Sequence, residues 1–231
     1  MTDGSFPIYG EVEDAESLRR QERSYAALAA SARRLADAVI RTRVDPARAD
    51  EVAADVDALA DRLLVDAVPG PLGPQLCSDG ILRDHANPAV GLRNPLAPPL
   101  VVEKDRDAAT ARTDVVLGAA YEGPPGLVHG GIIALVLDQV LGTVPALAGL
   151  PGMTASLALT YRRPTPLGRI GAHAWIAERD GWKVTVRGVL TDAGGATTVE
   201  AEGLFVVPRH YRSMLAQGEA PPSDVGEYPA T

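Results

Sequence analysis

Two amphipathic helices are predicted in the first 70 residues, because apolar side chains recur there at intervals of three and four residues. The first helix carries its apolar stripe at Tyr25, Leu28, Ala32, Leu35 and Val39. The second carries its stripe at Val52, Val56, Leu59 and Leu63. Asp45 and Pro46 form an N-cap and first-turn pair in front of the second helix. We therefore expect an antiparallel helical hairpin, which packs against the rest of the protein, stabilises an oligomer or covers a binding site.

From about residue 100 the pattern changes to extended runs separated by short turns. Six segments have the character of strands: 100–104, 108–117, 154–163, 168–178, 182–191 and 197–207. Between the second and the third lies a long apolar stretch, from about Gly130 to Ala148, which predicts a helix buried on most sides. Two strands, one helix and four strands indicate an α+β domain whose antiparallel sheet curves around that helix.

The part of this stretch from 131 to 150 has the length of a membrane span. However, Asp138 and Gln139 lie near its centre, where a charge costs about 2.5–3.5 kcal/mol on insertion. Pro145 interrupts it, and no basic cluster flanks it. We interpret it as a buried helix rather than a membrane span.

Four regions follow from these patterns. They are a helical extension over 1–70, a Pro- and Gly-rich connector over 71–99, the sheet-and-helix domain over 100–210 and a polar tail over 211–231. A short extended piece is expected near 80–82, inside the connector.

Composition narrows the function further. The chain has 231 residues, with 22 basic and 30 acidic side chains and a formal charge of −8, which is unfavourable for binding nucleic acid. Cys77 is the only cysteine, so neither an intrachain disulfide nor a Cys-rich zinc site can form. Residues 1–13 lack the apolar core of a secretory signal. We therefore expect a cytoplasmic protein.

Asp138 is the most informative residue, because every residue from 132 to 137 before it is apolar. A carboxylate in such surroundings is costly to bury in its charged form, and desolvation raises its pKa unless donors reach it. Core packing gains nothing from it, which favours a functional role over a satisfied structural one.

The helix begins at His129, Gly130 and Gly131. Backbone N–H groups in the first turn of a helix lack partners within the helix, and glycine leaves them open to an incoming oxygen. The same end carries partial positive charge. This is a suitable place to stabilise a developing oxyanion, although a glycine pair before a helix is more often only a turn.

Three parts of the sequence resemble the hotdog-fold acyl-CoA thioesterases of the phenylacetate-pathway and thioesterase-superfamily branch. They are the segment 121–131 (YEGPPGLVHGG), Asp138, and the segment 154–168 (TASLALTYRRPTPLG). The resemblance covers residues 100–207 and omits the helical extension. Many relatives carry Asn or Gln in the loop before the HGG motif, where this chain has Glu122, Gly123 and two prolines.

The resemblance implies hydrolysis of acyl-CoA to free acid and CoA by a dimer or a dimer of dimers, with each site between subunits. It implies that Asp138 is a general base or a nucleophile, and that the amide of Gly130, alone or with that of Gly131, binds the thioester oxygen. Thr154 would orient water or the carboxylate, and His129 would hold the loop or assist the thioester. No metal and no cofactor are implied.

CoA phosphates call for basic side chains, and the candidates are Arg162, Arg163, Arg169 and Lys183. Two other functions remain open. The fold could serve as a non-catalytic acyl-ligand binder or assembly module. His129 and Asp138 could also serve proton transfer in an enoyl-CoA hydratase or dehydratase, although the strand over 154–163 resembles thioesterases better.

Overall fold

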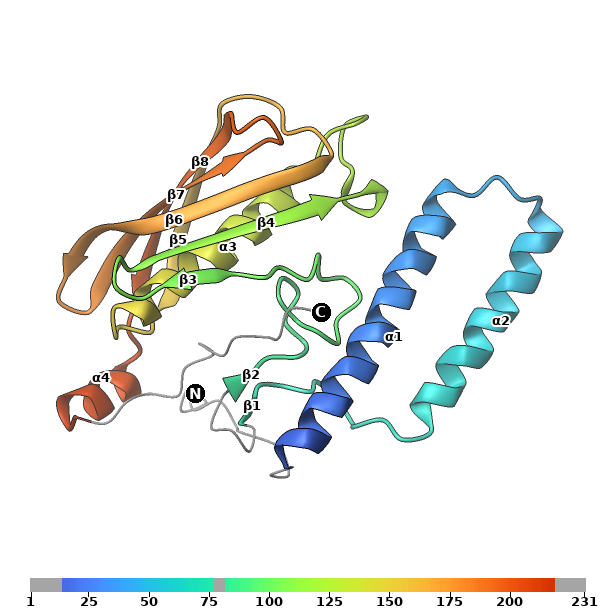
Figure 1. The fold of residues 1–231 in the computed structure, drawn as a ribbon, viewed down its shortest axis with the longest axis horizontal. Coiled ribbons are helices and arrows are strands. Elements are labelled where there is room, and N and C mark those ends of the chain that lie inside the picture. Colours follow the sequence, from blue (N-terminus) through green and yellow to red (C-terminus); the bar gives the residue numbers. More distant parts are fainter. Residues whose placement is uncertain (1–13, 77–81, 219–231) are drawn as a thin grey trace.

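The computed structural model describes residues 14–76 and 82–218 (Figure 1). The first part of the chain contains the helices α1 (Ala15–Arg41) and α2 (Pro46–Leu64) and the strands β1 (Gln75–Leu76) and β2 (Leu82–Arg83). The second part contains β3 (Glu103–Asp105), β4 (Thr110–Leu117), the 3-10 turn η1 (Ala119–Tyr121), α3 (Gly130–Leu147), β5 (Met153–Tyr161), β6 (Gly168–Asp180), β7 (Lys183–Thr191), β8 (Thr197–Val206) and α4 (Arg209–Ala216).

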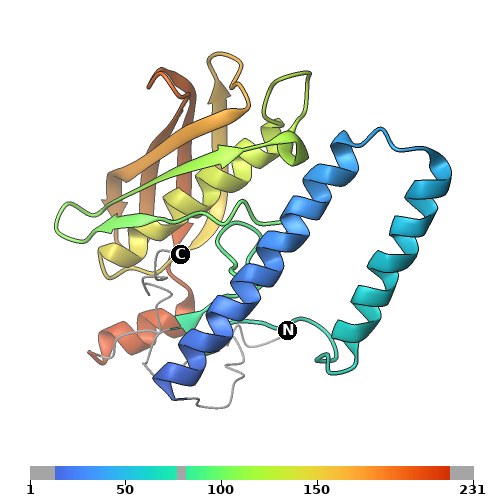
Figure 2. The same ribbon diagram turned by 45° about the vertical axis from the view of Figure 1, so that its right-hand side comes forward.

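Six strands form one antiparallel sheet in the order β3-β4-β6-β7-β8-β5, and this sheet curves around α3 (Figures 1 and 2). Strand β5 directly follows α3 in the chain, yet it lies at the edge of the sheet beside β8. The predicted α+β architecture, an antiparallel sheet wrapped around one central helix, is confirmed.

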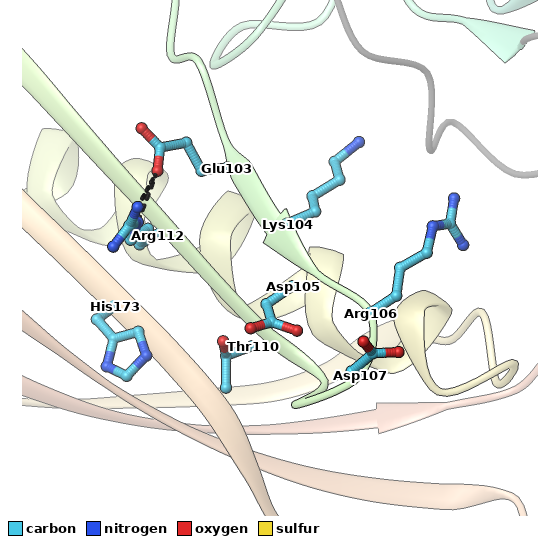
Figure 3. A pocket seen from close by; sticks show the side chains of 8 residues that line it. All are labelled: Glu103, Lys104, Asp105, Arg106, Asp107, Thr110, Arg112 and His173. Atoms are coloured by element: carbon cyan, nitrogen blue, oxygen red, sulfur yellow. Dashed lines mark hydrogen bonds and ion pairs between the residues drawn. The ribbon is translucent and has the colours of Figure 1, made fainter.

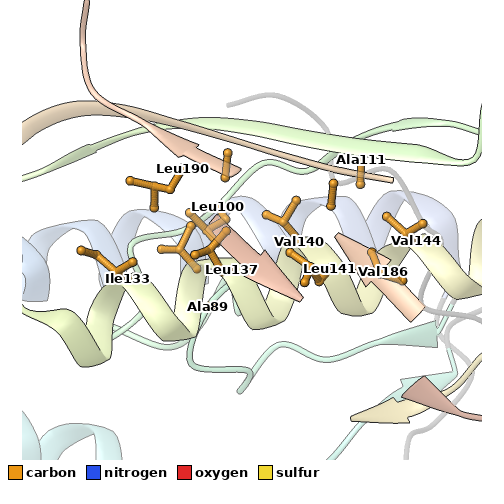
Figure 4. Close-up of a cluster of buried hydrophobic side chains, with 14 of the residues drawn as sticks. Ala89, Leu100, Ala111, Ile133, Leu137, Val140, Leu141, Val144, Val186 and Leu190 are labelled. Carbon is orange, nitrogen blue, oxygen red and sulfur yellow. The ribbon is translucent and has the colours of Figure 1, made fainter. Parts of the chain in front are cut away.

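Helix α3 forms the centre of the core, because apolar side chains surround it. Its buried residues are Ile133, Val136, Leu137, Val140, Leu141, Thr143, Val144, Pro145 and Leu147. Val186 and Leu190 of β7 meet them from the sheet (Figure 4). By length and composition alone this helix could cross a membrane, but here the sheet packs around it. Its apolar character is therefore explained by the core that it fills.

Gly188 of β7 allows α3 to approach the sheet closely. A Cβ atom at this position would lie 2.6 Å from Cδ1 of Leu141 and 2.9 Å from the backbone oxygen of His173. Both distances are shorter than normal packing allows, so a larger residue fits only if the Leu141 side chain or α3 shifts and the backbone of β6 moves as well.

Polar and stacking contacts hold helix α1 against the connector. The buried Arg83 side chain donates a hydrogen bond to the buried carboxylate of Glu22, and the imidazole of His85 lies 3.5 Å from the same carboxylate oxygen. One turn further along α1, the guanidinium group of Arg93 stacks on the ring of Tyr25 at 3.5 Å from its centroid. Burial lowers the pKa of His85, which favours the neutral imidazole inside this cluster.

The two helices of the expected hairpin and the short connection over 42–45 are confirmed, but their packing differs from expectation. Helices α1 and α2 run antiparallel, but both views show them standing apart, and α2 buries no side chain (Figures 1 and 2). The stripe predicted on α1 coincides only in part with its docking face: Tyr25 contacts Arg93, but Leu28 is 42% and Val39 62% exposed. Helix α1 instead buries Leu18, Glu22 and Ala29. The apolar pattern missed this face because a paired carboxylate occupies its centre.

Two strand boundaries and the tail also differ from expectation. The strand expected over 100–104 is Glu103–Asp105, and its turn covers 106–109 rather than 105–107. The tail predicted over 211–231 begins inside α4, because Tyr211 and Leu215 pack against the core. The extended piece expected near 80–82 falls partly on β2 and partly outside the described residues, as does the tail beyond 218.

Replacing Gly188 with alanine should lower the free energy of unfolding by about 1–3 kcal/mol, because the added methyl group overlaps both the Leu141 side chain and the backbone of β6. Gly142→Ala is the matched control: a Cβ there would lie 3.4 Å from Cε1 of Phe205, an ordinary contact. In the middle of a helix that change should be neutral or stabilise by about 0.5–1 kcal/mol. Urea denaturation measures both, and equal stability of the two variants would contradict the close packing.

Candidate active site

Asp138 lies in the middle of α3, half-buried at the border between the core and solvent. The hydroxyl of Thr154, at the start of β5, donates a hydrogen bond to Oδ1 of Asp138 at 3.0 Å. Within residues 14–76 and 82–218, no lysine or arginine forms an ion pair with this carboxylate. Asp138 therefore has one neutral donor, no cationic partner and access to solvent.

A β-bulge at Ala155 turns Thr154 toward Asp138. Thr154 pairs with Phe205 and Ser156 with Leu204, so Ala155 is one extra residue in β5. Further along, Tyr161 pairs with Val199, and both Phe205 and Val199 are buried on the inner face of the sheet. A regular strand would place Thr154 and Tyr161 on opposite faces, because they are seven residues apart. The bulge changes this alternation, so both side chains reach α3.

His129 is the N-cap of α3, and its Nδ1 accepts a hydrogen bond from the N–H of Gly131 at 3.0 Å. The hydroxyl of Tyr161 donates to the carbonyl oxygen of Gly130 at 2.8 Å. These two bonds hold opposite ends of the same peptide group, the one that joins Gly130 to Gly131. Over the described part of the chain, the N–H of Gly130 donates no hydrogen bond.

The loop before His129 is tightly fixed. The N–H of His129 donates to the carbonyl oxygen of Tyr121, and Oε1 of Glu122 accepts from the N–H of Gly126 at 2.6 Å. A Cβ atom on Gly123 would lie 2.8 Å from Cα of His129. Gly123 therefore gives His129 the room that it needs, in the loop where relatives were expected to carry Asn or Gln.

The basic candidates are spread over the sheet. Arg162 pairs with Glu200 at 2.7 Å, and Arg169 pairs with Asp114 at 3.4 Å. Arg163 is exposed and lies two residues after Tyr161, the last residue of β5. Lys183 pairs in register with Val206, and Val206 also pairs with Met153 at the start of β5. Lys183 therefore lies at the opposite end of the sheet from Arg163.

One surface hollow, of about 830 Å³, lies beside the β3–β4 hairpin (Figure 3). Its lining is strongly charged and consists of Glu103, Lys104, Asp105, Arg106, Asp107, Thr110, Arg112 and His173. It contains none of the predicted site residues, so it is separate from the candidate active site. No group of three or more His, Cys, Asp or Glu residues within the described ranges could hold a metal ion.

The structure thus brings Thr154 to Asp138 and places His129, Gly130 and Gly131 together at the start of α3. It also assigns contacts to Tyr161 and Gly123, for which no role was predicted from the sequence. Tyr161 stands in the segment 154–168 that carried the resemblance, but its spacing from Thr154 conceals that both face α3. Gly123 shows its importance only through its distance from His129.

Comparison with known proteins identifies the family. No family model matches the sequence. A solved structure of a thioesterase superfamily protein is 38% identical, with a TM-score of 0.70, and the match covers 79% of this chain and 94% of that one. The chain belongs to the thioesterase superfamily. The shared part exceeds the sheet and α3, so the likeness extends beyond the core of this thioesterase-superfamily chain.

Shorter matches come from curated proteins. The acyl-coenzyme A thioesterase THEM4 of Mus musculus is 46% identical over 50 residues, and that of Xenopus laevis 43% over 51. Each match covers 22% of this superfamily member and spans only about a fifth of the relative, namely 21% and 23%. Among solved structures, that of a phenylacetic acid degradation-related protein from Ralstonia eutropha JMP134 is 26% identical over 47% of this chain, with a TM-score of 0.44.

Proposed function

We propose that this protein hydrolyses acyl-CoA thioesters to the free acid and CoA, in a site completed by a second copy of the chain. The observation that carries the proposal is the contact between Asp138 and Thr154: a carboxylate on a mostly apolar helix, with no cationic partner among the described residues, is held by a hydroxyl from β5. The curated relatives, which are named acyl-coenzyme A thioesterases, support the substrate class.

Thr154 engages one carboxylate oxygen of Asp138 and leaves the other available for chemistry. As a general base, that oxygen removes a proton from water while the water oxygen attacks the thioester carbon. As a nucleophile, it attacks the carbon itself and forms an anhydride that water then cleaves. In both routes the C–S bond breaks, and CoA leaves as a thiolate that takes up a proton.

Gly130 is suited to stabilise the oxygen of the tetrahedral intermediate. Its N–H is unoccupied among the described residues and lies in the first turn of α3, at the positive end of the helix dipole. A donor of this kind typically contributes about 10²–10³-fold in rate. Gly131 is less suited, because its N–H already donates to His129.

These two groups cannot serve one substrate from within a single chain. Eight residues separate Gly130 from Asp138, which corresponds to about 12 Å along an α-helix. A reacting carbonyl must lie about 3 Å from both the nucleophile and the oxyanion donor. Each site therefore needs Asp138 from one protomer and Gly130 from another.

Strand β5 supplies the geometry for this arrangement. It is an edge strand whose residues are largely exposed, including Met153 and Tyr161, which are 54% and 53% exposed. Antiparallel pairing with the same strand of a second copy, centred on Leu157, places Met153 opposite Tyr161 of the partner subunit. Because Tyr161 holds Gly130 and Thr154 holds Asp138, this pairing brings the two halves of the site together.

Arg163 is the first candidate for the CoA phosphates. It is exposed two residues after Tyr161, just beyond the end of β5, and no ion pair engages it within the described residues. Arg162 and Arg169 would have to leave Glu200 and Asp114 to bind phosphate. Lys183 lies at the Met153 end of the sheet, which the pairing places near Arg163 of the partner subunit.

Asp138→Asn should keep the fold and lower kcat by about 10²–10⁴-fold, because the amide can neither remove a proton nor attack the thioester. Release of the CoA thiol from a panel of acyl-CoAs measures the effect. Asp57→Asn, which changes an exposed carboxylate of α2, is the control and should leave kcat unchanged. Equal turnover by Asp138→Asn would refute hydrolysis through this carboxylate, and hydration of enoyl-CoA by the wild type would identify a hydratase instead.

Gly130→Pro should lower kcat by about 10²–10³-fold, because proline removes the proposed oxyanion donor. Proline is tolerated in the first turn of a helix, and the ψ of 133° at His129 suits a residue before proline. Gly130→Ala keeps the N–H and places a similar Cβ near the Tyr161 hydroxyl, at 3.2 Å. If both variants lost the same activity, crowding rather than the missing donor would be responsible.

A further inference from the structure

The first turn of α3 has a backbone that is intrinsically flexible. Gly130 and Gly131 follow each other there, and glycine has more backbone freedom than any other residue. An oxyanion donor contributes most when its N–H points at the substrate oxygen before the reaction begins. The first turn of this helix therefore needs contacts from outside the glycines to fix its direction.

The peptide group between Gly130 and Gly131 has such contacts at both ends. Tyr161 holds its oxygen at 2.8 Å, and Nδ1 of His129 holds its N–H at 3.0 Å. Because a peptide group is planar, these bonds fix its orientation and limit rotation about the backbone of Gly130. The N–H of Gly130 belongs to the preceding peptide group, whose oxygen, that of His129, accepts from the N–H groups of Ile132 and Ile133. With the following peptide group also held, both peptide planes that flank Gly130 are fixed, and so is the direction of its N–H.

The two contacts differ in origin. His129 is a neighbour in sequence and acts as a local N-cap. Tyr161 comes from β5, 31 residues after Gly130. Its hydroxyl lies 3.2 Å from the position that a Cβ atom on Gly130 would occupy. Tyr161 thereby ties the direction of the Gly130 amide to the strand that also carries Thr154.

We propose that Tyr161 is a positioning residue for the reaction: it acts through the Gly130–Gly131 peptide and directs the Gly130 amide toward the thioester oxygen. This inference rests on the proposed function. It assigns no proton transfer and no substrate contact to the phenol. A purely structural tie between β5 and α3 would predict a loss of stability instead, with no specific effect on the oxyanion donor.

The test is a double-mutant cycle between Tyr161→Phe and Gly130→Pro, in the full chain, with the acyl-CoA that the wild type hydrolyses fastest. Tyr161→Phe alone should lower kcat by about 10- to 100-fold with little change in KM, because a misdirected donor weakens only the transition state. In the Gly130→Pro background the same change should have no further effect, because the donor is already absent. An unchanged kcat, or the same factor in both backgrounds, overturns the proposal.

Tyr121→Phe is the matched control, because the Tyr121 hydroxyl also donates to a backbone carbonyl, that of Leu96 at 3.4 Å. It should leave kcat unchanged. Amide hydrogen exchange gives a second readout that does not depend on turnover: Tyr161→Phe should speed exchange of the Gly131 N–H, and Tyr121→Phe should not. If the wild type hydrolyses no acyl-CoA, the proposed function fails, while unchanged exchange at Gly131 would overturn the positioning role by itself.

Discussion

The whole candidate site depends on the rigid spacing of Gly130 and Asp138 along one helix. Both residues are fixed to α3, and α3 is fixed in turn by the sheet that surrounds it. In the proposed mechanism, the helix supplies an oxyanion donor and a carboxylate that one chain cannot bring to the same carbonyl. Under this proposal, the core that makes the helix rigid is also the reason that the site needs a second copy.

Strand β5 connects these two groups to the surface where a second copy can bind. Thr154 near one end reaches Asp138, and Tyr161 at the other end reaches Gly130. The bulge at Ala155 makes this double contact possible by turning both side chains to the same face. The strand also has a free edge, so a symmetric pairing through it would align both contacts at once.

Much of the fold could be predicted from the sequence, because alternating and helical patterns are local and the core obeys them. Asp138 was found for the same reason: a carboxylate in an apolar run is a visible exception. The docking face of α1 was not found, because its centre is Glu22, whose partner Arg83 lies far along the chain. The bulge and the role of Tyr161 were also missed, since one extra residue in a strand leaves no clear mark in its pattern.

Subunit complementation tests the shared site most directly. Protomers with Asp138→Asn and protomers with Gly130→Pro are each inactive, and they are mixed under conditions that exchange subunits. Half of the dimers then combine both variants and contain one intact site, so about a quarter of wild-type activity should return. A mixture that stays as inactive as its parents would show that Asp138 and Gly130 act within one chain, which would contradict the shared site.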